Sequence, residues 1–548
     1  MKKINIMLLA LIASVLTAAA QDSYTILSEC DTLVKAQLGG DFSFGSRQVR
    51  HIVYEYPSTD AEGNAATVSG IIMIPADIYD GSVPCDGIIM YNHYTMGDPG
   101  EALSLSGEAL DAVTGILANP LKPNYIIVAS DYIGYGSSID SNVSYICGDT
   151  NGRNSLDGLL AAKQLFEDRQ IPQGKFLFNM GYSQGGTESM FAAKLTDTEE
   201  KYKSIRFDKT FSGGGPLDFE KIYSIYAKQD VVDDIADVVL MLISANENYH
   251  LGFDYHDMFQ EPLASKALEY FKAKDKSVLS EIGVMDCDRI SQVMQPVFLD
   301  MESEPVQKLC AKLREISLTT GWEPDVTKNY YIEHSRHDNY VPIQSVRNII
   351  PWMTEKGFDP SIVPGKSSLQ TATIVFKLKH QESAIVWAIQ TMAAIQFWPV
   401  LYYEGEQNRY FRSIVGDLDI MKVIKTLESL GIDLRKIIKD KSLSRSNLPV
   451  NYTLFDLIPD IGDVLAKVDL TTDDLEEMCN DAGISQVDIL MAYAYLMTEE
   501  ETEEAPAATT TLEERVEAPL FLLRSYEQTL ANWFKLAGYD VNYELWGM

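Results

Sequence analysis

Residues 181–186 read Gly-Tyr-Ser-Gln-Gly-Gly and join an apolar run, 175–180, to a helix-forming run, 187–194. A serine between glycines at a strand-to-helix turn is typical of a nucleophile elbow, which exposes the serine hydroxyl. Such a turn imposes strained backbone angles on Ser183, so its neighbours must be small, as Gly181 and Gly185 are. The N-terminus of the following helix would direct N–H groups at the hydroxyl. The pattern therefore predicts Ser183 as a nucleophile.

A serine hydroxyl near neutral pH needs an adjacent base, and that base needs an acid to orient it. In elbow hydrolases the chain order is serine, acid, histidine. Asp338 follows the apolar run 330–332 and is the candidate acid, and His380 is the one histidine that comes later in the sequence. The order therefore predicts His380 as the base. Asp218, which follows another predicted strand, is the alternative acid.

These residues make the chain similar to the α/β-hydrolases and, among them, to the secretory lipases. Asp338 and the Val-Pro pair at 341–342 match the Asp-x-x-Val-Pro loop of the superfamily, while Ser183 matches its nucleophile and His380 its histidine. Residues 131–138, Asp-Tyr-Ile-Gly-Tyr-Gly-Ser-Ser, match a segment that we expect to be structural. The resemblance covers about residues 45–395. It implies a secreted serine hydrolase that cleaves carboxylic esters and needs no cofactor.

The oxyanion of such a reaction requires two N–H donors. The residue after the nucleophile, Gln184, supplies one of them. The family usually takes the other from a His-Gly-x turn, but here Tyr94 follows His93 in the loop after the predicted strand 87–91. The second donor is therefore Thr95 or Tyr94, of which we favour Thr95. We expect His93 to order this turn rather than to transfer protons.

A metal site is not predicted. His334 and His337 form a His-x-x-His pair that lacks a third ligand, because Glu333 is expected to point to the opposite face of a strand. A catalytic zinc site needs three protein ligands and an open position. We therefore expect no metal and no cofactor.

The expected fold class is α/β, with a mainly parallel central sheet in an α/β-hydrolase fold. Apolar strands alternate with helices, as a parallel sheet requires, and a hairpin of strands 50–56 and 67–74 precedes them. The hydrolase core is predicted over 21–215 and 327–400. Residues 216–326 are predicted to form a helical lid over an acyl pocket. Methionines 258, 285, 294 and 301 would suit a flexible wall of that pocket, although each of them taken singly is more typical of a helix core. A helical C-terminal extension is predicted over 401–548, with an acidic and threonine-rich linker near 499–511.

Residues 1–20 have two lysines, a short apolar core and an Ala-Ala-Ala end, which predicts a signal peptide. We therefore expect export from a bacterium to the periplasm or the medium, with no integral membrane segment after cleavage. The net charge of -34 argues against nucleic acid and against anionic lipid surfaces. The expected partner is a small-molecule or lipid ester, and the sequence leaves open the oligomeric state and the pairing of its six cysteines.

Two other functions use the same features. A serine exopeptidase of this fold would cleave amides by identical chemistry. A non-catalytic binding protein could retain the fold, although an intact set of Ser183, Asp338 and His380 in the expected order argues against that loss. The elbow also resembles that of the cutinases, but those enzymes are small and have no lid.

Overall fold

A computed structural model of the chain describes residues 23–37, 43–105, 113, 115–118, 123–347, 349–358, 360–361, 369–374 and 378–402. The chain divides into a first unit, Met1–His334 with Asp338–Asp359, and a second unit, Ser335–His337 with Pro360–Met548. Each unit is described by itself. The predicted signal peptide, the linker near 499–511 and the extension beyond residue 402 lie outside the described residues.

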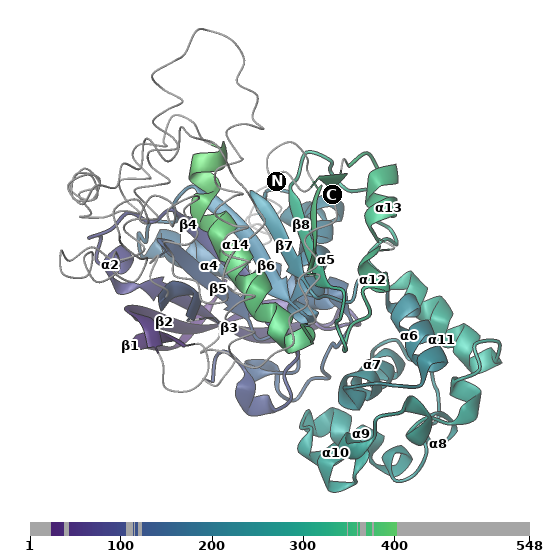
Figure 1. The fold of residues 1–548 in the computed structure, drawn as a ribbon. Helices are drawn as coiled ribbons and strands as arrows, with labels where there is room; N and C mark the ends of the chain where they lie inside the picture. Colours follow the sequence, from purple (N-terminus) through teal and green to yellow (C-terminus); the bar gives the residue numbers. More distant parts are fainter. Residues whose placement is uncertain are drawn as a thin grey trace, which may run out of the picture. The chain divides into compact units, whose positions relative to one another are not determined.

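The first unit is built on a mixed β-sheet with the strand order β1-β2-β3-β5-β4-β6-β7-β8 (Figure 1). β1, β2, β3 and β5 pair in antiparallel fashion, and β5, β4, β6, β7 and β8 pair in parallel. The strands are β1 Thr25–Gln37, β2 Ser43–Thr59, β3 Ala65–Pro75, β4 Gly87–Asn92, β5 Tyr125–Ser130, β6 Phe176–Tyr182, β7 Lys209–Gly213 and β8 Tyr330–Ser335. This arrangement confirms the predicted mainly parallel sheet behind an antiparallel hairpin.

The central strands are apolar because both of their faces are covered. Every residue of β4, β5 and β7 is buried, as expected for parallel strands between layers of helices. α4 (Gly148–Asp168) and α5 (Gln184–Thr198) follow β5 and β6 and pack against each other and the sheet. Side chains such as Leu159 and Phe166 of α4 join Ile72 and Val128 of the strands in the hydrophobic core.

The sequence prediction differs from the structure most at the edge of the sheet. β1 was not predicted, and its residues are exposed on both faces apart from a few such as Val34, so it has no alternation of apolar and polar residues. The predicted hairpin is longer than expected, since β2 and β3 extend to Thr59 and Ala65 at the turn. The strand before Asp218, whose apolar pattern predicts residues 207–211, begins as β7 at Lys209.

Helices fill the long connection between β7 and β8, and Figure 1 shows them gathered in one group. We call this connection the helical insertion; its helices are α6 Phe219–Gln229, α7 Ile235–Asn248, α8 Tyr255–Met258, α9 Leu263–Ala273, α10 Ser277–Glu281 and α11 Glu304–Glu315. Asp218 and Asp234 cap α6 and α7 with side-chain bonds to Lys221 N and Asp237 N. That the insertion acts as a lid stays a prediction.

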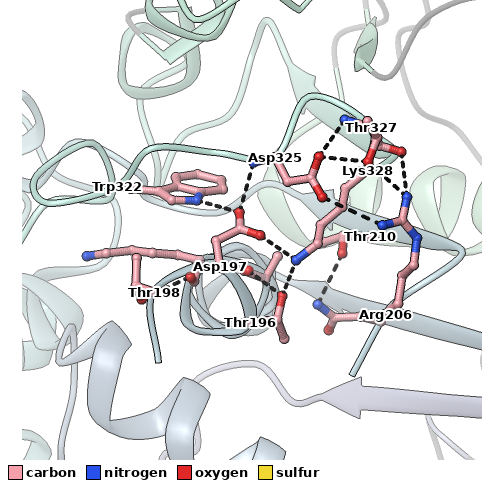
Figure 2. A network of polar contacts seen from close by, with 12 residues as sticks. Thr196, Asp197, Thr198, Arg206, Thr210, Trp322, Asp325, Thr327 and Lys328 are labelled. Atoms are coloured by element: carbon pink, nitrogen blue, oxygen red, sulfur yellow. Dashed lines mark hydrogen bonds and ion pairs between the residues drawn. The ribbon is translucent and has the colours of Figure 1, made fainter. Parts of the chain in front are cut away.

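A buried polar network holds the end of the insertion against the core (Figure 2). The side chains of Lys328 and Asp197 form an ion pair at the C-terminal end of α5, with exposed fractions of 10% and 5%. Asp197 also accepts from Trp322 Nε1 at 2.8 Å and from Asp325 N at 3.2 Å. Arg206 donates to Thr327 from the loop before β7. The segment that leads into β8 is thus fastened to α5 and to the start of β7.

Shorter helices complete the first unit. They are α2 Ala76–Tyr79, α12 Gln344–Arg347 and α13 Ile349–Glu355, with the 3-10 turns η1 Pro99–Glu101, η2 Gly136–Ser138, η3 Glu200–Tyr202, η4 Val284–Asp286, η5 Ile290–Gln292 and η6 Pro296–Phe298. The described part of the second unit contains β9 (Pro360–Ser361), β10 (Leu369–Ile374) and α14 (His380–Tyr402), and β9 pairs with β10 in parallel. The apolar pattern at 373–378 predicts a strand before His380, and the described part of that strand, β10, begins earlier, at Leu369.

Two further observations on the described residues concern the cysteines and the possibility of a membrane span. The five cysteines among them, Cys30, Cys85, Cys147, Cys287 and Cys310, are all free thiols. None of the helices that the structure describes has the length and apolar character needed to cross a membrane.

Candidate active site

Ser183 lies at the turn between β6 and α5, as the elbow sequence predicts. Its backbone angles are φ 57° and ψ −125°, a strained conformation for a residue with a side chain. The Ser183 N–H donates to Gly213 O of β7 at 2.9 Å, which fixes the turn against the neighbouring strand. Strain of this kind is common at functional sites, because the surrounding structure must hold the residue in place.

The glycines of the elbow are required by close backbone contacts. A Cβ atom on Gly185 would lie 2.0 Å from Asn92 O at the end of β4, and a Cβ on Gly181 would lie 2.2 Å from Gly185 O. Both distances are far below contact distance to backbone atoms that cannot turn aside. The first turn of α5 therefore lies directly against β4, which places the loop after β4 beside Ser183. We call residues 93–98 the oxyanion loop after their predicted role.

The predicted oxyanion donors occupy two segments that meet at this place. Gln184 is the first residue of α5, and the first N–H groups of a helix have no carbonyl partner within it. Ser183 O accepts from Gly186 N and Thr187 N at 2.9 and 3.2 Å, which closes the first turn. Tyr94 and Thr95 follow β4, and Thr95 Oγ1 donates to Tyr145 OH at 3.4 Å. The assignment of the second donor to Thr95 or Tyr94 stays a prediction.

His93 braces the loop after β4. It is buried, its Nδ1 lies 2.6 Å from Tyr94 O, and its Nε2 lies 3.2 Å from Asp131 O. The imidazole stacks on the Tyr132 ring with 4.0 Å between centroids. Burial lowers the pKa of His93, so the ring is neutral at pH 7. These contacts agree with the structural role expected for it.

The segment 131–138 is likewise structural. Asp131 is fully buried and accepts from Ser69 Oγ at 2.6 Å and from Ser104 N at 3.0 Å. Ser69 Oγ in turn accepts from Ser137 N at 2.8 Å. A Cβ on Gly136, which has φ +52°, would lie 2.0 Å from Ser69 Oγ. The glycine therefore lets the loop after β5 close over β3.

Asp338 lies in a tight loop that follows β8. We call residues 336–342 the acid loop after the predicted role of Asp338. Its side chain has no exposed surface, and its Oδ1 accepts from Tyr340 N at 2.9 Å and from Val341 N at 2.7 Å. His334 Nε2 donates to Val341 O at 2.8 Å and lies 3.5 Å from Asp338 Oδ2. Two backbone N–H groups thus orient the carboxylate, and His334 braces the same loop.

The alternative acid, Asp218, has a different function in the structure. It is the N-cap of α6, and its Oδ1 accepts from Lys221 N at 3.0 Å. A carboxylate at this position stabilises a helix through the exposed N–H groups and the dipole. The structure therefore gives Asp218 a capping role.

His380 is the first residue of α14 in the second unit, and it is buried. Its carbonyl oxygen accepts from Ser383 Oγ at 2.9 Å. Ser183 and Asp338 belong to the first unit. That the His380 imidazole meets Ser183 and Asp338 stays a prediction.

A cavity of about 40 Å³ in the first unit brings Ser183 together with the acid loop and the insertion. Tyr340 and Val341 line it from the acid loop, and α6 and α7 supply much of the remaining wall. The other lining residues are Tyr145, Ile146, Pro216, Ile222, Tyr226, Asp234, Asp237, Val238 and Met241. A single water occupies about 10–15 Å³ by this kind of measure, so the cavity holds only a few waters.

None of the four methionines considered for the wall of the insertion lines the cavity, and two of them have the burial expected of helix-core residues. Met241 of α7 lines the cavity, whereas Met258 and Met294 are fully buried within the insertion. Met285 is 38% exposed. The acidic residues of the wall were also not predicted. The Lys276 ammonium lies 3.3 Å from Asp234 Oδ2 and 3.0 Å from Asp237 Oδ1.

Three bonds fasten the insertion to loops of the site. Lys276 N donates to Gly97 O, in the loop after β4, at 2.9 Å. Asn339 Nδ2 donates to Asp233 Oδ2 at 2.6 Å, and Tyr226 OH donates to Tyr340 O. The insertion thus lines the cavity with α6 and α7 and contacts both the oxyanion loop and the acid loop.

Comparison with known proteins supports the fold. No family model matches the chain, and no curated protein matches it. A candidate hydrolase from Legionella pneumophila is 16% identical, with a TM-score of 0.55 over 69% of this chain and 97% of that one. The rice cell wall degrading esterase LipA from Xanthomonas oryzae is 20% identical, with a TM-score of 0.53 over 68% of this chain and 96% of that one. The chain therefore has the α/β-hydrolase fold that its elbow sequence predicts.

Proposed function

We propose that this protein is a serine hydrolase that cleaves carboxylic esters through an acyl-enzyme formed on Ser183. The observation that carries the proposal is the strained Ser183 at the strand-to-helix turn, in one cavity with Tyr340 and Val341 of the acid loop. A backbone held in this conformation has no evident structural use, whereas it presents a hydroxyl to a substrate. The ester class takes support from LipA, a structural neighbour that is an esterase.

In the proposed reaction the Ser183 oxygen attacks the ester carbonyl carbon while the His380 imidazole takes the hydroxyl proton. Asp338 orients that imidazole and stabilises its charged form. The N–H groups of Gln184 and Thr95 hold the tetrahedral oxyanion. The imidazolium then gives its proton to the leaving alcohol, and water attacks the acyl-enzyme with His380 again as the base.

The small cavity bears on how an ester enters. The cavity has room for only a few waters, so in this proposal α6 and α7 move away from Ser183 to admit an ester with an extended chain. The insertion would then act as a lid, as the sequence predicts. Entry of substrate would break the contacts of the insertion with Gly97, Asn339 and Tyr340.

A serine aminopeptidase is the second candidate, because two carboxylates line the cavity beside Ser183. Asp234 and Asp237 could pair with the free amino group of a peptide. However, the Lys276 ammonium already pairs with both carboxylates. Burial opposes the charge on Lys276, but the two carboxylates outweigh it and raise its pKa. The occupied carboxylates favour the esterase over the peptidase.

Labelling with a fluorophosphonate tests the nucleophile. We expect one adduct on Ser183 in the folded protein, no adduct in Ser183→Ala, and greatly slowed labelling in His380→Ala. His256→Ala removes an exposed histidine of the insertion and is the matched control, expected to label normally. Folded wild-type protein that gives no adduct would favour the non-catalytic binding protein.

A substrate panel tests the reaction class. p-Nitrophenyl esters of rising chain length would be assayed beside Xaa-Pro anilides. Turnover of the esters is expected, and turnover of the anilides alone would replace the esterase by the exopeptidase.

Export is the remaining part of the proposal. Cleavage after residue 20 would give a mature protein that begins at Gln21. N-terminal sequencing of protein from the periplasm or the medium of an expressing bacterium checks this, and an intact Met1 on all of the protein would contradict it.

A further inference from the structure

Glu188 is a buried carboxyl group one helical turn beyond Gln184 in α5. Residues four apart on a helix lie on the same face, so its side chain lies beneath the elbow. The side chain is fully buried, and its Oε1 accepts from Gln184 Nε2 at 3.3 Å and from Asn151 Nδ2 at 2.9 Å. Glu188 therefore holds the side chain of the residue whose N–H is proposed to bind the oxyanion.

The same carboxyl group also supports the opposite wall of the cavity. Asn151 Nδ2 donates to Ser144 O at 2.7 Å as well as to Glu188. Ser144 directly precedes Tyr145 and Ile146, which line the cavity with Ser183. Ile146 has φ 57°, a strained value for a β-branched residue. A chain of buried hydrogen bonds thus joins the start of α5 to a strained loop beside the nucleophile.

The other oxygen of this carboxyl group has no partner. Glu188 Oε2 is buried and makes no hydrogen bond to any described residue. An ionised carboxylate buried with one oxygen unpaired is costly, whereas the carboxylic acid is not charged. Burial raises the pKa of Glu188 to about 8, and the two amide donors only partly oppose that shift.

Several other titratable groups lie around Glu188. From α4 it faces Asp149, which raises its pKa further and pairs with Lys194 of α5 at 3.2 Å. Burial raises the pKa of Cys147 to about 12 and raises those of Tyr132 and Tyr249 well above their ordinary value. His93, stacked on Tyr132, has a lowered pKa and is neutral. The loss of a proton from Glu188 would therefore add a negative charge that these groups do not offset.

We propose that Glu188 is a positioning residue that works in its uncharged form, holding Gln184 and the Tyr145–Ile146 loop around Ser183, and that its ionisation limits ester hydrolysis at alkaline pH. The inference rests on the proposed esterase function. The proton leaves to solvent, and the charge that remains lies beneath the N–H groups that must stabilise an oxyanion. A negative charge there lowers the positive electrostatic potential that these N–H groups create at the oxyanion, and it therefore raises the barrier to acyl transfer.

The same titration predicts a pH dependence of stability. In the unfolded chain Glu188 has its ordinary pKa of 4.5, and in the folded protein its pKa is about 8. Between these values the folded state keeps a proton that the unfolded state has released, so the free energy of unfolding falls as pH rises through this window. Below pH 4.5 and above pH 8 the contribution of this group does not change with pH.

The test compares Glu188→Gln, which keeps the shape of the uncharged side chain, with Glu188→Ala. Glu167→Gln, on the exposed end of α4, is the control. The rate constant kcat/KM for p-nitrophenyl butyrate is measured from pH 5 to pH 10, and urea unfolding is measured over the same range. Wild type and Glu167→Gln are expected to lose about tenfold in kcat/KM by pH 9, as a single ionisation near pH 8 requires. Glu188→Gln should keep its rate, and Glu188→Ala should be slower at every pH.

Three results would overturn the proposal. The first is a fall of kcat/KM at alkaline pH that is as steep in Glu188→Gln as in wild type. The second is a wild-type kcat/KM that does not fall at alkaline pH. The third is a Glu188→Gln protein that is inactive at every pH although its urea unfolding curve shows that it is folded. Fluorophosphonate labelling separates this inference from the proposed function. Wild type that is neither labelled nor active on esters refutes the function, whereas normal labelling with an unchanged pH profile in Glu188→Gln refutes the role of Glu188.

Discussion

The elbow and the helical insertion both border the cavity, but they are held in place in different ways. At the elbow, backbone contacts set the geometry, since Gly185 and Gly181 lie so close to neighbouring carbonyls that no side chain fits. The insertion contacts the site loops through hydrogen bonds, among them Ser244 Oγ to Tyr145 O at 2.7 Å, and through the polar network at its end. We infer that the nucleophile is held rigidly, while the wall above it can shift without disturbing Ser183.

The largest effect should come from the rigid part. Ser183→Ala is expected to reduce kcat for p-nitrophenyl butyrate by about 10⁶-fold, as loss of the nucleophile does in other serine hydrolases. The free energy of unfolding should not fall, because the substitution removes only a hydroxyl group and leaves the backbone unchanged. Ser137→Ala, in an exposed turn, is the control and should keep full activity. Retention of more than a hundredth of the rate in Ser183→Ala would show that another residue carries the chemistry.

The two candidate acids give the next largest effect and a matched pair. Asp338→Asn should lower kcat by about 10⁴-fold, because an amide in place of the orienting carboxylate favours the wrong imidazole tautomer. Asp218→Asn removes a charge from the N-cap of α6 but keeps a capping side chain, so it should change the free energy of unfolding by less than about 1 kcal/mol. Its kcat should stay near that of wild type. The reverse pattern would make Asp218 the acid.

A third prediction concerns the polar network at the end of the insertion. Lys328→Met leaves Asp197 buried without its cation and should lower the free energy of unfolding by about 3–5 kcal/mol. Lys203→Met breaks an exposed ion pair with Glu200 and should cost less than about 1 kcal/mol. Urea unfolding of both variants measures the difference. Equal losses would mean that the network in Figure 2 does not anchor the segment before β8.

The contrast also explains what the sequence could predict. The elbow has a local signature because its backbone contacts demand glycine at fixed spacings from Ser183. The acid loop has one too, since the backbone bonds to Asp338 need a short turn after a strand. β1 lacked a pattern because it is exposed on both faces, and the cavity wall lacked one because Asp234, Met241 and Tyr340 meet only after folding.

Glu188 could be identified only in part from the sequence. The sequence shows an acidic residue four positions beyond Gln184 in the helix that follows the elbow, but only the structure shows that the helix is buried around it. Its partner Asn151 is on another helix, and sequence spacing carries no information about that contact. The sequence could therefore flag the residue but not its environment.

The smallest effect is expected where the insertion contacts the acid loop. Asp233→Ala removes the acceptor of Asn339 Nδ2, and Tyr226→Phe removes the hydroxyl that binds Tyr340 O. One hydrogen bond contributes about 0.5–1.5 kcal/mol, so each change should favour an open insertion by about two- to tenfold. The rate constant kcat/KM for p-nitrophenyl octanoate should rise by up to that factor, while that for the acetate, which needs less room, should change little.

Lys266→Ala is the control for this experiment, because it breaks an exposed ion pair with Glu269 that lies wholly within the insertion. It should leave the ratio of octanoate to acetate rates unchanged. Equal gains for both esters in the Asp233 and Tyr226 variants would indicate a change at Ser183 itself. Unchanged ratios would mean that these bonds do not hold the insertion closed, and the contrast between a rigid elbow and a movable wall would then fail, since the wall would be as firmly fixed as the nucleophile beneath it.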